Sequence, residues 1–411
     1  MTTPLAGLRI LDFTQYEAGT SATQTLAWLG ADVVKVERPG TGEPGRGRGA
    51  GPLDRTYFLT LNTNKRSIAI DLKRQEGLDL VYRLLPRFDV VSENLAPGTM
   101  DELGLGYERL RELHPPVIYA SIKGFGSTGP YSHYRSYDMV AQAAGGSMSI
   151  TGTADTPPIR SGATYGDTGT GMKLAIGILS AYVRQLKTGE GGHVEVSMQD
   201  AIASYSRVGF LARENVGDPV PRIGNNLRQL PPTNTFACKP FGPNDYVYVV
   251  ANTGPMLERL MIVLGHPELA DDPRLTSAEN RRQNEQWLQG LIEGWTAGRT
   301  KFEAMADLQA AGIPAGATFD SGDIFHDAHL IERGMVQEVE HPTRGKVEII
   351  GNPIRIDHHY TRLRHSPLLG ADTYEVLRDE LGLSEAELGE LDAAGTISAY
   401  ADVSARPLVK A

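Results

Sequence analysis

Residues 8–37, LRILDFTQYEAGTSATQTLAWLGADVVKVE, indicate the fold class of this chain. Residues 8–13 form a short, mostly apolar run that is typical of a buried strand, and residues 22–29 favour a helix that ends at Gly30. Residues 33–37 are rich in β-branched side chains and predict a second strand. A strand, a helix and a strand within about thirty residues make a βαβ unit.

The same alternation continues towards the middle of the chain. Strands are predicted at 67–72, 89–91, 117–122 and 193–198, and helices at 75–85, 100–113, 136–145 and 172–186. Alternation of this kind predicts an α/β fold in which helices cover both faces of a parallel sheet.

The 411 residues exceed what one hydrophobic core usually serves, so we expect two domains. Residues 219–232 hold four prolines and few apolar side chains, which indicates a linker. The predicted division is a large domain over 1–218, this linker, and a smaller α+β domain over 233–330. Residues 331–411 then hold a hairpin pattern, centred on 343–345, and a C-terminal helix.

Composition narrows the class of protein. The chain has 40 Lys and Arg against 50 Asp and Glu, a net charge of −10, which argues against a nucleic-acid partner. A single cysteine, Cys238, cannot form an internal disulfide. The N-terminus lacks the features of a signal peptide, and no run of about 18 apolar residues is present. We therefore expect a cytoplasmic protein without a membrane partner.

The charge reverses sign in one segment. Residues 35–73 hold eight basic and four acidic side chains, a local charge of +4. In an open α/β sheet, ligands bind beyond the carboxyl ends of the strands. The residues that follow the predicted strands there include cations and amides, namely Gln15, Arg38, Lys73, Asn94 and Lys123. These features predict a site for an anionic ligand; the alternative is that the cations are merely solvated loop residues.

Several familiar sites are absent from the sequence. The first βα loop has neither a dinucleotide-binding glycine pattern nor a phosphate-binding lysine motif, and no G-x-S-x-G nucleophile is present. The histidines at 326 and 329 and at 358, 359 and 365 lack metal-ligand spacing, so we expect no metal. Asp167 precedes a strong helix within GDTGTGM at 166–172. It is either a helix N-cap or a carboxylate nucleophile or base, and both roles are compatible.

Six short stretches, spread over nearly the whole chain, combine into a specific pattern, although each is weak alone. They are DFT at 12–14, LGADVVKVE at 29–37, NKRS at 64–67, ENLAPG at 93–98, VEVSMQDA at 194–201 and SPLLG at 366–370. Together they resemble the class III CoA-transferase family, of the CaiB/BaiF type. The stretches at 166–172 and YDMVAQ at 137–142 are most similar to formyl-CoA:oxalate-type transferases.

The resemblance implies a fold and a reaction. The fold is a Rossmann-like large domain, built from N- and C-terminal parts (331–411 returning to it) around the smaller domain, in an interlocked homodimer. In the reaction, Asp167 attacks an acyl-CoA donor to give an aspartyl anhydride, and CoA thiolate returns to form an aspartyl-CoA thioester. A small carboxylate or dicarboxylate acceptor then takes the CoA. Coenzyme A thioester is a substrate, and no permanently bound cofactor is implied.

Site residues follow by matching positions. The substrate pocket is expected to hold Gln15, Glu17, Ala18, Tyr137 and Asp138. The CoA-binding positions are expected to be Arg38, Lys73, Asn94, Lys123 and Arg135.

Three departures from the formyl-CoA transferase pattern bear on the substrate. Residues 223–228 read IGNNLR where those enzymes have a run of glycines, Glu102 stands in place of an arginine, and Glu17 and Asp138 replace Gln and Glu. The acids exchanged therefore stay open, with Arg48, Arg222 and Arg228 as candidate counter-charges.

Two other functions compete with transfer. A 2-methylacyl-CoA racemase would use the same aspartate, but such enzymes carry a His-Asp pair where this chain has Tyr137 and Asp138, so one of two proton carriers is missing. A non-catalytic CoA-binding protein is the second alternative, in which Asp167 would be only a helix cap.

Overall fold

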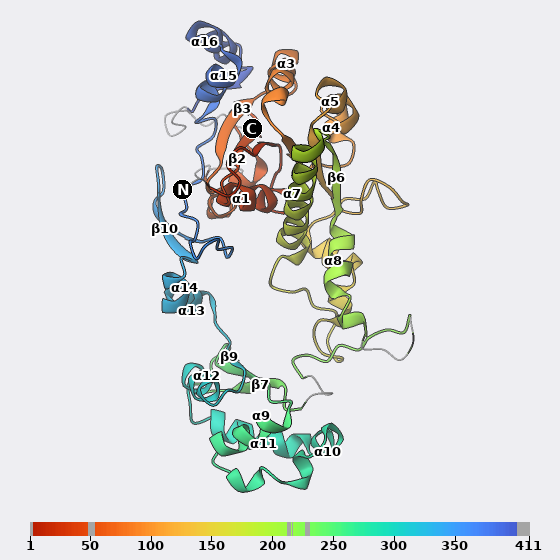
Figure 1. Ribbon diagram of the computed structural model, residues 1–411, viewed down its shortest axis with the longest axis vertical. Coiled ribbons are helices and arrows are strands. Elements are labelled where there is room, and N and C mark those ends of the chain that lie inside the picture. Colours follow the sequence, from red (N-terminus) through yellow and green to blue (C-terminus); the bar gives the residue numbers. More distant parts are fainter. Residues whose placement is uncertain (1–2, 48–53, 212–214, 216, 227–230, 401–411) are drawn as a thin grey trace. The chain divides into compact units, whose positions relative to one another are not determined.

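The computed structural model describes residues 3–47, 54–211, 215, 217–226 and 231–400. The chain divides into two compact units, each of which is described by itself (Figure 1). The large unit holds Met1–Met148, Arg160–Ala212 and Ile331–Ala411, and the small unit holds Ser149–Ile159 and Arg213–Leu330.

The large unit is built on a seven-stranded sheet in the order β12-β3-β2-β1-β4-β5-β6. All neighbouring pairs are parallel except β12 and β3. Because β1 lies between β2 and β4, the loops after β1 and β4 turn away from each other, which is where such sheets bind ligands. The strands are β1 (Arg9–Asp12), β2 (Asp32–Glu37), β3 (Arg66–Ile70), β4 (Val90–Glu93), β5 (Ile118–Lys123), β6 (Gly192–Ser197) and β12 (Ile397–Ser398).

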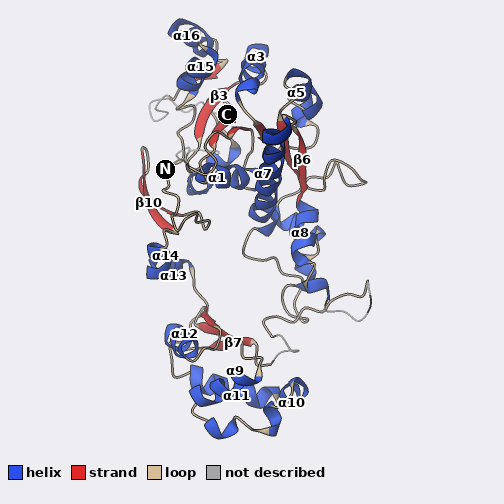
Figure 2. Cartoon of the chain, viewed as in Figure 1, coloured by secondary structure: helices blue, strands red, loops and turns tan. Residues whose placement is uncertain are grey.

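Helices cover both faces of this sheet, which confirms the predicted α/β architecture (Figure 2). Ile10 and Leu11 of β1 are both fully buried but belong to two different hydrophobic cores, as expected for a strand between two helical layers. One core includes α1 (Ala18–Trp28), α6 (Asp138–Ala144), α7 (Thr170–Thr188) and α8 (Met198–Ser206). The other includes α3 (Gln75–Leu84), α4 (Thr99–Glu102), α5 (Tyr107–Leu113), α15 (Thr373–Leu381) and α16 (Glu385–Ala393).

Two local predictions for the large unit meet different outcomes. The single helix expected over 100–113 is wrong: α4 and α5 are separate, because Gly104 between them has φ +74°, a left-handed conformation that stops a helix. The hairpin is confirmed, with β10 (Val336–His341) antiparallel to β11 (Gly345–Ile350). The short helix α2 (Thr56–Leu61) lies in a stretch for which no element was predicted.

The small unit packs helices against a three-stranded antiparallel sheet, in the order β7-β8-β9. Its core joins Phe236, Val247, Leu260, Ile292 and Leu308. The strands are β7 (Asn234–Ala237), β8 (Tyr246–Val249) and β9 (Ala315–Ala317). The helices are α9 (Gly254–Val263), α10 (Ala278–Gln283), α11 (Glu285–Thr296), α12 (Lys301–Ala310) and α13 (Ser321–His326), with α14 (Ala328–Glu332) at the boundary of the units.

Among the described residues, no helix combines the length and apolar character needed to cross a membrane.

Candidate active site

A cleft of about 320 Å³ opens in the large unit at the carboxyl ends of β1, β4 and β5. Its walls come from the loops after these strands, the segment that leads into α6, and the turn before α7. The cleft brings together eight of the eleven site residues expected from the sequence. The three that do not line it are Arg38, Lys73 and Asp138.

Asp167 is half-buried in this cleft, in a π-helical turn over Tyr165–Gly169 that leads directly into α7. The interpretation of Asp167 as a helix N-cap is wrong, because Gly169 occupies that position and no side chain caps the helix. Within the described part of the chain, no group donates a hydrogen bond to the Asp167 carboxyl. Its oxygens are therefore available to a ligand.

Asp138 fixes the turn that carries Asp167. Its Oδ1 accepts a hydrogen bond from the Gly166 backbone N–H at 2.8 Å, and its Oδ2 accepts one from Gln142 Nε2 at 2.8 Å. The side chain is 4% exposed, so it supports the cleft from behind. Gly166 is required by this approach, because a Cβ there would stand 2.7 Å from the Asp138 carbonyl oxygen.

Glu17 connects the same turn to the start of α1. Glu17 is the N-terminal flanking residue of α1, and its Oε1 accepts hydrogen bonds from the hydroxyls of Thr164 and Thr168, the second at 2.7 Å. The Tyr57 phenol of α2 also interacts with this carboxylate. A negative charge is thereby held beside Asp167.

The electrostatics of the cleft favour the protonated form of Asp167. Burial first, and then the charges of Glu17 and Asp138, raise the pKa of Asp167 to about 7. Burial and the same negative surroundings, Glu17 and Asp167 foremost, raise the pKa of the Tyr57 phenol. Asp167 therefore changes its charge near neutral pH, which is typical of a functional carboxyl group.

Asn94 ties together the two loops at the centre of the sheet. Its Oδ1 accepts from the Gln15 backbone N–H at 2.7 Å, and its Nδ2 donates to the Gln15 carbonyl at 2.8 Å. Both polar atoms of the Asn94 amide are thus hydrogen-bonded to the Gln15 backbone. Its observed contribution is to shape the cleft between β1 and β4.

Lys123, at the end of β5, is held in an ion pair. Its Nζ lies 2.8 Å from a carboxylate oxygen of Glu93 and donates to the Leu95 carbonyl at 2.9 Å. Burial raises the pKa of Glu93 despite the adjacent ammonium group. The Lys123 ammonium group therefore has protein partners where it meets the cleft.

The remaining expected cations are more open. Arg135 is exposed and lines the cleft, next to Tyr137, which is 61% exposed. Arg38 and Lys73 are also exposed, beyond the carboxyl ends of β2 and β3. The structure places them on the edge of the sheet that carries the cleft, but outside its lining.

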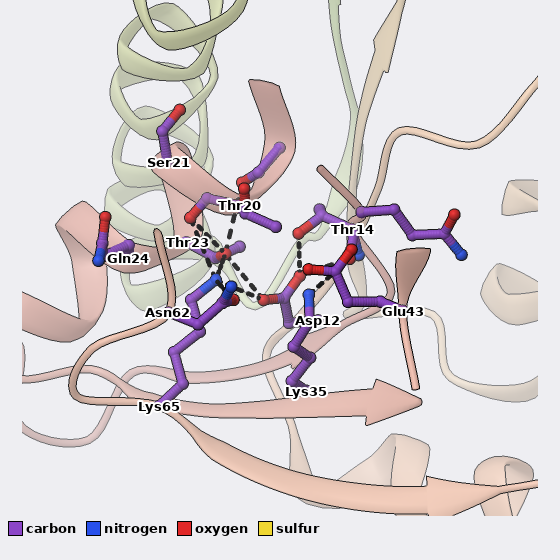
Figure 3. Close-up of polar contacts among 12 residues, drawn as sticks. Asp12, Thr14, Thr20, Ser21, Thr23, Gln24, Lys35, Glu43, Asn62 and Lys65 are labelled. Carbon is purple, nitrogen blue, oxygen red and sulfur yellow. Dashed lines mark hydrogen bonds and ion pairs between the residues drawn. The ribbon is translucent and has the colours of Figure 1, made fainter. Parts of the chain in front are cut away.

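A buried charge cluster surrounds Asp12, at the end of β1 (Figure 3). Lys65 Nζ lies 3.0 Å from Asp12 Oδ2 and also donates to Thr23 Oγ1 and Asn62 Oδ1, each at 2.9 Å. Burial lowers the pKa of Lys65 to about 8 against the attraction of Asp12. Burial alone would raise the pKa of Asp12, but the ammonium groups of Lys65 and Lys35 bring it below its ordinary value.

This cluster anchors the cleft loop through backbone contacts. Asp12 Oδ1 accepts from the Thr14 backbone N–H at 2.9 Å, and Lys35 Nζ donates to the Thr14 carbonyl at 2.6 Å (Figure 3). Glu43 Oε2 accepts from the Tyr16 backbone N–H at 3.0 Å. The loop from β1 to α1 is therefore held at both Thr14 and Tyr16, directly before Glu17.

Part of the positive segment 35–73 is internal, so the local charge of +4 overstates the positive charge at its surface. Lys35 and Lys65 are buried in the cluster just described. Arg46 is also buried, with two 2.7 Å contacts to the Glu37 carboxylate and its guanidinium 3.7 Å from the centre of the Phe58 ring. Three of the eight cations are thus buried and stabilise the fold. These three are neither cations of an anion-binding site nor solvated loop residues.

Of the three candidate counter-charges, the structure describes Arg222. Arg222 belongs to the small unit, where it donates to the carbonyls of Thr153 and Thr156. Arg48 and Arg228 lie outside the described residues.

Sequence reasoning missed several residues that build the site. Tyr57, Thr164, Thr168 and Tyr134 carry no motif by themselves, and hydroxyl-bearing residues are common in loops. The nearest signal was the position of Thr164 and Thr168 on either side of Asp167. Their common partner, Glu17, is about 150 residues away and is found only in the fold.

The fold and the cleft agree with a sequence comparison. The family model of CoA-transferase family III matches residues 5–373. The chain belongs to CoA-transferase family III. As a member it is a transferase that moves CoA, with CoA thioesters as the substrates of the class, so the alternative of a non-catalytic CoA-binding protein is excluded.

Individual relatives cover nearly the whole of this transferase. It is 42% identical to a formyl-CoA:oxalate CoA-transferase of Streptomyces avermitilis, over 97% of this chain and 100% of the relative. A protein of the same name from Streptomyces coelicolor is 41% identical, over 96% and 99%. Among solved structures, a CAIB/BAIF family protein from Brucella suis superposes with a TM-score of 0.80 at 32% identity, over 92% of this chain and 100% of that one.

Proposed function

We propose that Asp167 is the nucleophile that transfers CoA from an acyl-CoA donor to a small carboxylic acid. The observation that carries this proposal is the state of its carboxyl group. It lines the cleft, lacks a hydrogen-bond donor among the described residues, and has a pKa raised to about 7. A carboxylate that is more basic than usual and poorly solvated is a better nucleophile towards a thioester.

The proposed cycle passes through two covalent intermediates and regenerates the Asp167 carboxylate. Asp167 Oδ attacks the thioester carbonyl, the C–S bond breaks, and an aspartyl-acyl anhydride and CoA thiolate result. The thiolate then attacks the aspartyl carbonyl, which gives an aspartyl-CoA thioester and releases the donor acid. The acceptor carboxylate attacks this thioester, and CoA thiolate returns to the acyl carbon of the new anhydride. Asp167 leaves as the free carboxylate.

The open cations suit the CoA phosphates. Arg38 and Lys73 are exposed on the sheet edge that carries the cleft, and Arg135 stands at the cleft itself. We propose these three as phosphate contacts, with Gln15 and Ala18 beside the pantetheine arm. Asn94 and Lys123 are proposed to act mainly by shaping the wall, since their polar groups already have protein partners.

The contacts of Asp138 support transfer over racemisation. A racemase needs two groups that exchange protons with the α-carbon on opposite sides. Asp138 is 4% exposed, and each of its oxygens accepts a hydrogen bond from the protein. Tyr137 stands where such enzymes have a histidine. Asp138 is therefore not suited to carry a proton at this position.

We also propose a homodimer of interlocked chains that acts in the cytoplasm, with no nucleic-acid or membrane partner. The outer side of α7 supports association, because Ile176, Val183 and Leu186 are between 48% and 68% exposed. Sedimentation equilibrium would test the dimer, and a mass equal to one chain would contradict it.

Trapping tests the nucleophile. Incubation with acyl-CoA donors, formyl-CoA included, followed by hydroxylamine, should convert Asp167 to its hydroxamate, which peptide mass spectrometry locates. Asp167→Asn should give no transfer and no adduct. Asp79→Asn, which changes an exposed carboxylate on α3, is the matched control and should behave as wild type. Full transfer by Asp167→Asn, or an adduct elsewhere, would refute the mechanism.

A further inference from the structure

Glu17 is an acidic side chain fixed beside a nucleophile of the same charge. It lines the cleft together with Asp167, and its carboxylate has two hydroxyl donors, from Thr164 and Thr168. An ionised carboxylate only accepts hydrogen bonds, so these donors fit the charged form. Both donors flank Asp167 in the sequence. The negative charge is therefore held at one place relative to the reacting residue.

We propose that Glu17 determines the class of acid that this site accepts. It excludes acids with a second carboxylate next to the reacting one, and admits monocarboxylates whose remaining part is uncharged. This inference rests on the proposed function, because it concerns the acid that reacts with CoA-loaded Asp167. In that state Asp167 is an uncharged thioester, so the fixed charge that an incoming acid meets is that of Glu17.

The other charged groups that face the cleft do not offset Glu17. Asp138, behind the turn, adds a second negative charge. Lys123 is paired with Glu93. This leaves Arg135 as the unpaired cation among the described lining residues, and it is exposed to solvent. The reacting carboxylate and the CoA phosphates already compete for that guanidinium, so a second carboxylate finds no partner there.

The rest of the wall suits an uncharged group. Tyr16 and Tyr137 meet edge to face, with ring centroids 6.4 Å apart, and Tyr134 lines the same cleft. The rings of Tyr16 and Tyr137 are 43% and 61% exposed. Aromatic rings with neutral hydroxyls bind apolar or hydrogen-bonding groups. The lining thus complements the uncharged part of a monocarboxylate.

Oxalate and oxamate are matched probes, because oxamate replaces one carboxylate by an uncharged amide of similar shape. Their affinities are measured by isothermal titration calorimetry with CoA present, in an Asp167→Asn background. This background copies the uncharged state of the loaded residue and prevents turnover. Oxamate should bind more tightly than oxalate. Adding Glu17→Gln should reduce the oxamate preference by roughly 10- to 100-fold, as expected for removing a like charge at short range.

Tyr57→Phe is the control, because it removes a hydroxyl group that interacts with Glu17 but keeps the charge of Glu17. The oxamate preference should persist. Thermal melting checks that each protein is folded. The inference is overturned by a preference that Glu17→Gln leaves unchanged, by tighter binding of oxalate with Glu17 intact, or by absence of binding of both probes to every variant. Failure of the proposed function has a different signature, since Asp167 of the wild type would stay unmodified in the trapping experiment.

Discussion

The half-buried carboxyl of Asp167 should control how the reaction depends on pH. Only the ionised form can attack a thioester, so the rate of donor loading should rise with pH and level off above the pKa of Asp167, about 7. Burial is the main cause of this high pKa, and the charges of Glu17 and Asp138 contribute. Glu17→Gln removes one of these charges while it keeps the side-chain shape. It should therefore move the rise to lower pH.

The size of the change follows from Coulomb's law. Two unit charges about 6 Å apart, at an effective dielectric constant of about 20, repel by roughly 3 kcal/mol, and about 1.4 kcal/mol corresponds to one pH unit. Solvent reaches the half-exposed Glu17, which weakens the repulsion, so we expect the rise to move down by roughly one pH unit. At pH 5, the loading rate relative to its plateau should then increase roughly tenfold.

Single-turnover loading between pH 5 and pH 9 measures this effect, with the hydroxamate of Asp167 quantified after rapid quenching. Glu190→Gln, which removes an exposed carboxylate after α7, is the matched control and should leave the profile in place. A wild-type rise near pH 4, the ordinary range of an aspartate, would refute the assigned environment. An unchanged profile in Glu17→Gln would refute the contribution of Glu17.

Three further predictions concern stability. Because the pKa of Asp167 is raised in the folded state, ionisation of Asp167 opposes folding. Asp167→Asn should match the wild type at pH 4 and, as the pH rises through about 7, become more stable than the wild type by roughly 2–4 kcal/mol in urea unfolding. Equal stabilities at pH 8 would contradict this. Gly166→Ala places a Cβ 2.7 Å from the Asp138 carbonyl and should cost about 1–3 kcal/mol and slow loading, whereas a fully active, equally stable variant would show that the turn can yield. Lys65→Met removes the ion-pair partner of the buried Asp12 and should cost about 3–5 kcal/mol. The exposed Lys73→Met should cost less than about 0.5 kcal/mol, and similar losses in both would refute the role of the cluster.

The sequence predicted the order of elements in the large unit well, and the errors have local causes. The helix after β1 was expected from residue 22 but begins at Ala18. Its first turns are rich in threonine and serine, which have weak helix propensity. In the fold these side chains are buried, and Thr23 donates to Asp12 and accepts from Lys65. Tertiary contacts therefore override the local preference.

The candidate site was predicted in part. Matching positions identified Asp167, Glu17 and Asp138 as members of one site, and the fold brings Asp167 and Glu17 into one cleft, with Asp138 behind it. Local pattern misjudged Asp167 as a possible N-cap, because a π-helical turn before α7 has no distinct sequence signature. The signs of charges in 35–73 were counted correctly, but the count cannot tell a buried ion pair from a surface cation.

The sequence by itself determined the alternation of strands and helices, and hence a parallel sheet whose loops after β1 and β4 carry the candidate residues. The spacing of hydrophobic residues and the glycines and prolines that end helices and strands act over a few residues, so the sequence alone reveals them. Only the tertiary structure decided that Glu17 accepts hydrogen bonds from Thr164 and Thr168 and that Lys65 forms an ion pair with Asp12. It also decided that no hydrogen-bond donor among the described residues reaches the Asp167 carboxyl. Those contacts depend on the packing of segments far apart in sequence, because this packing determines both how deeply Asp167 is buried and which charged groups lie near it.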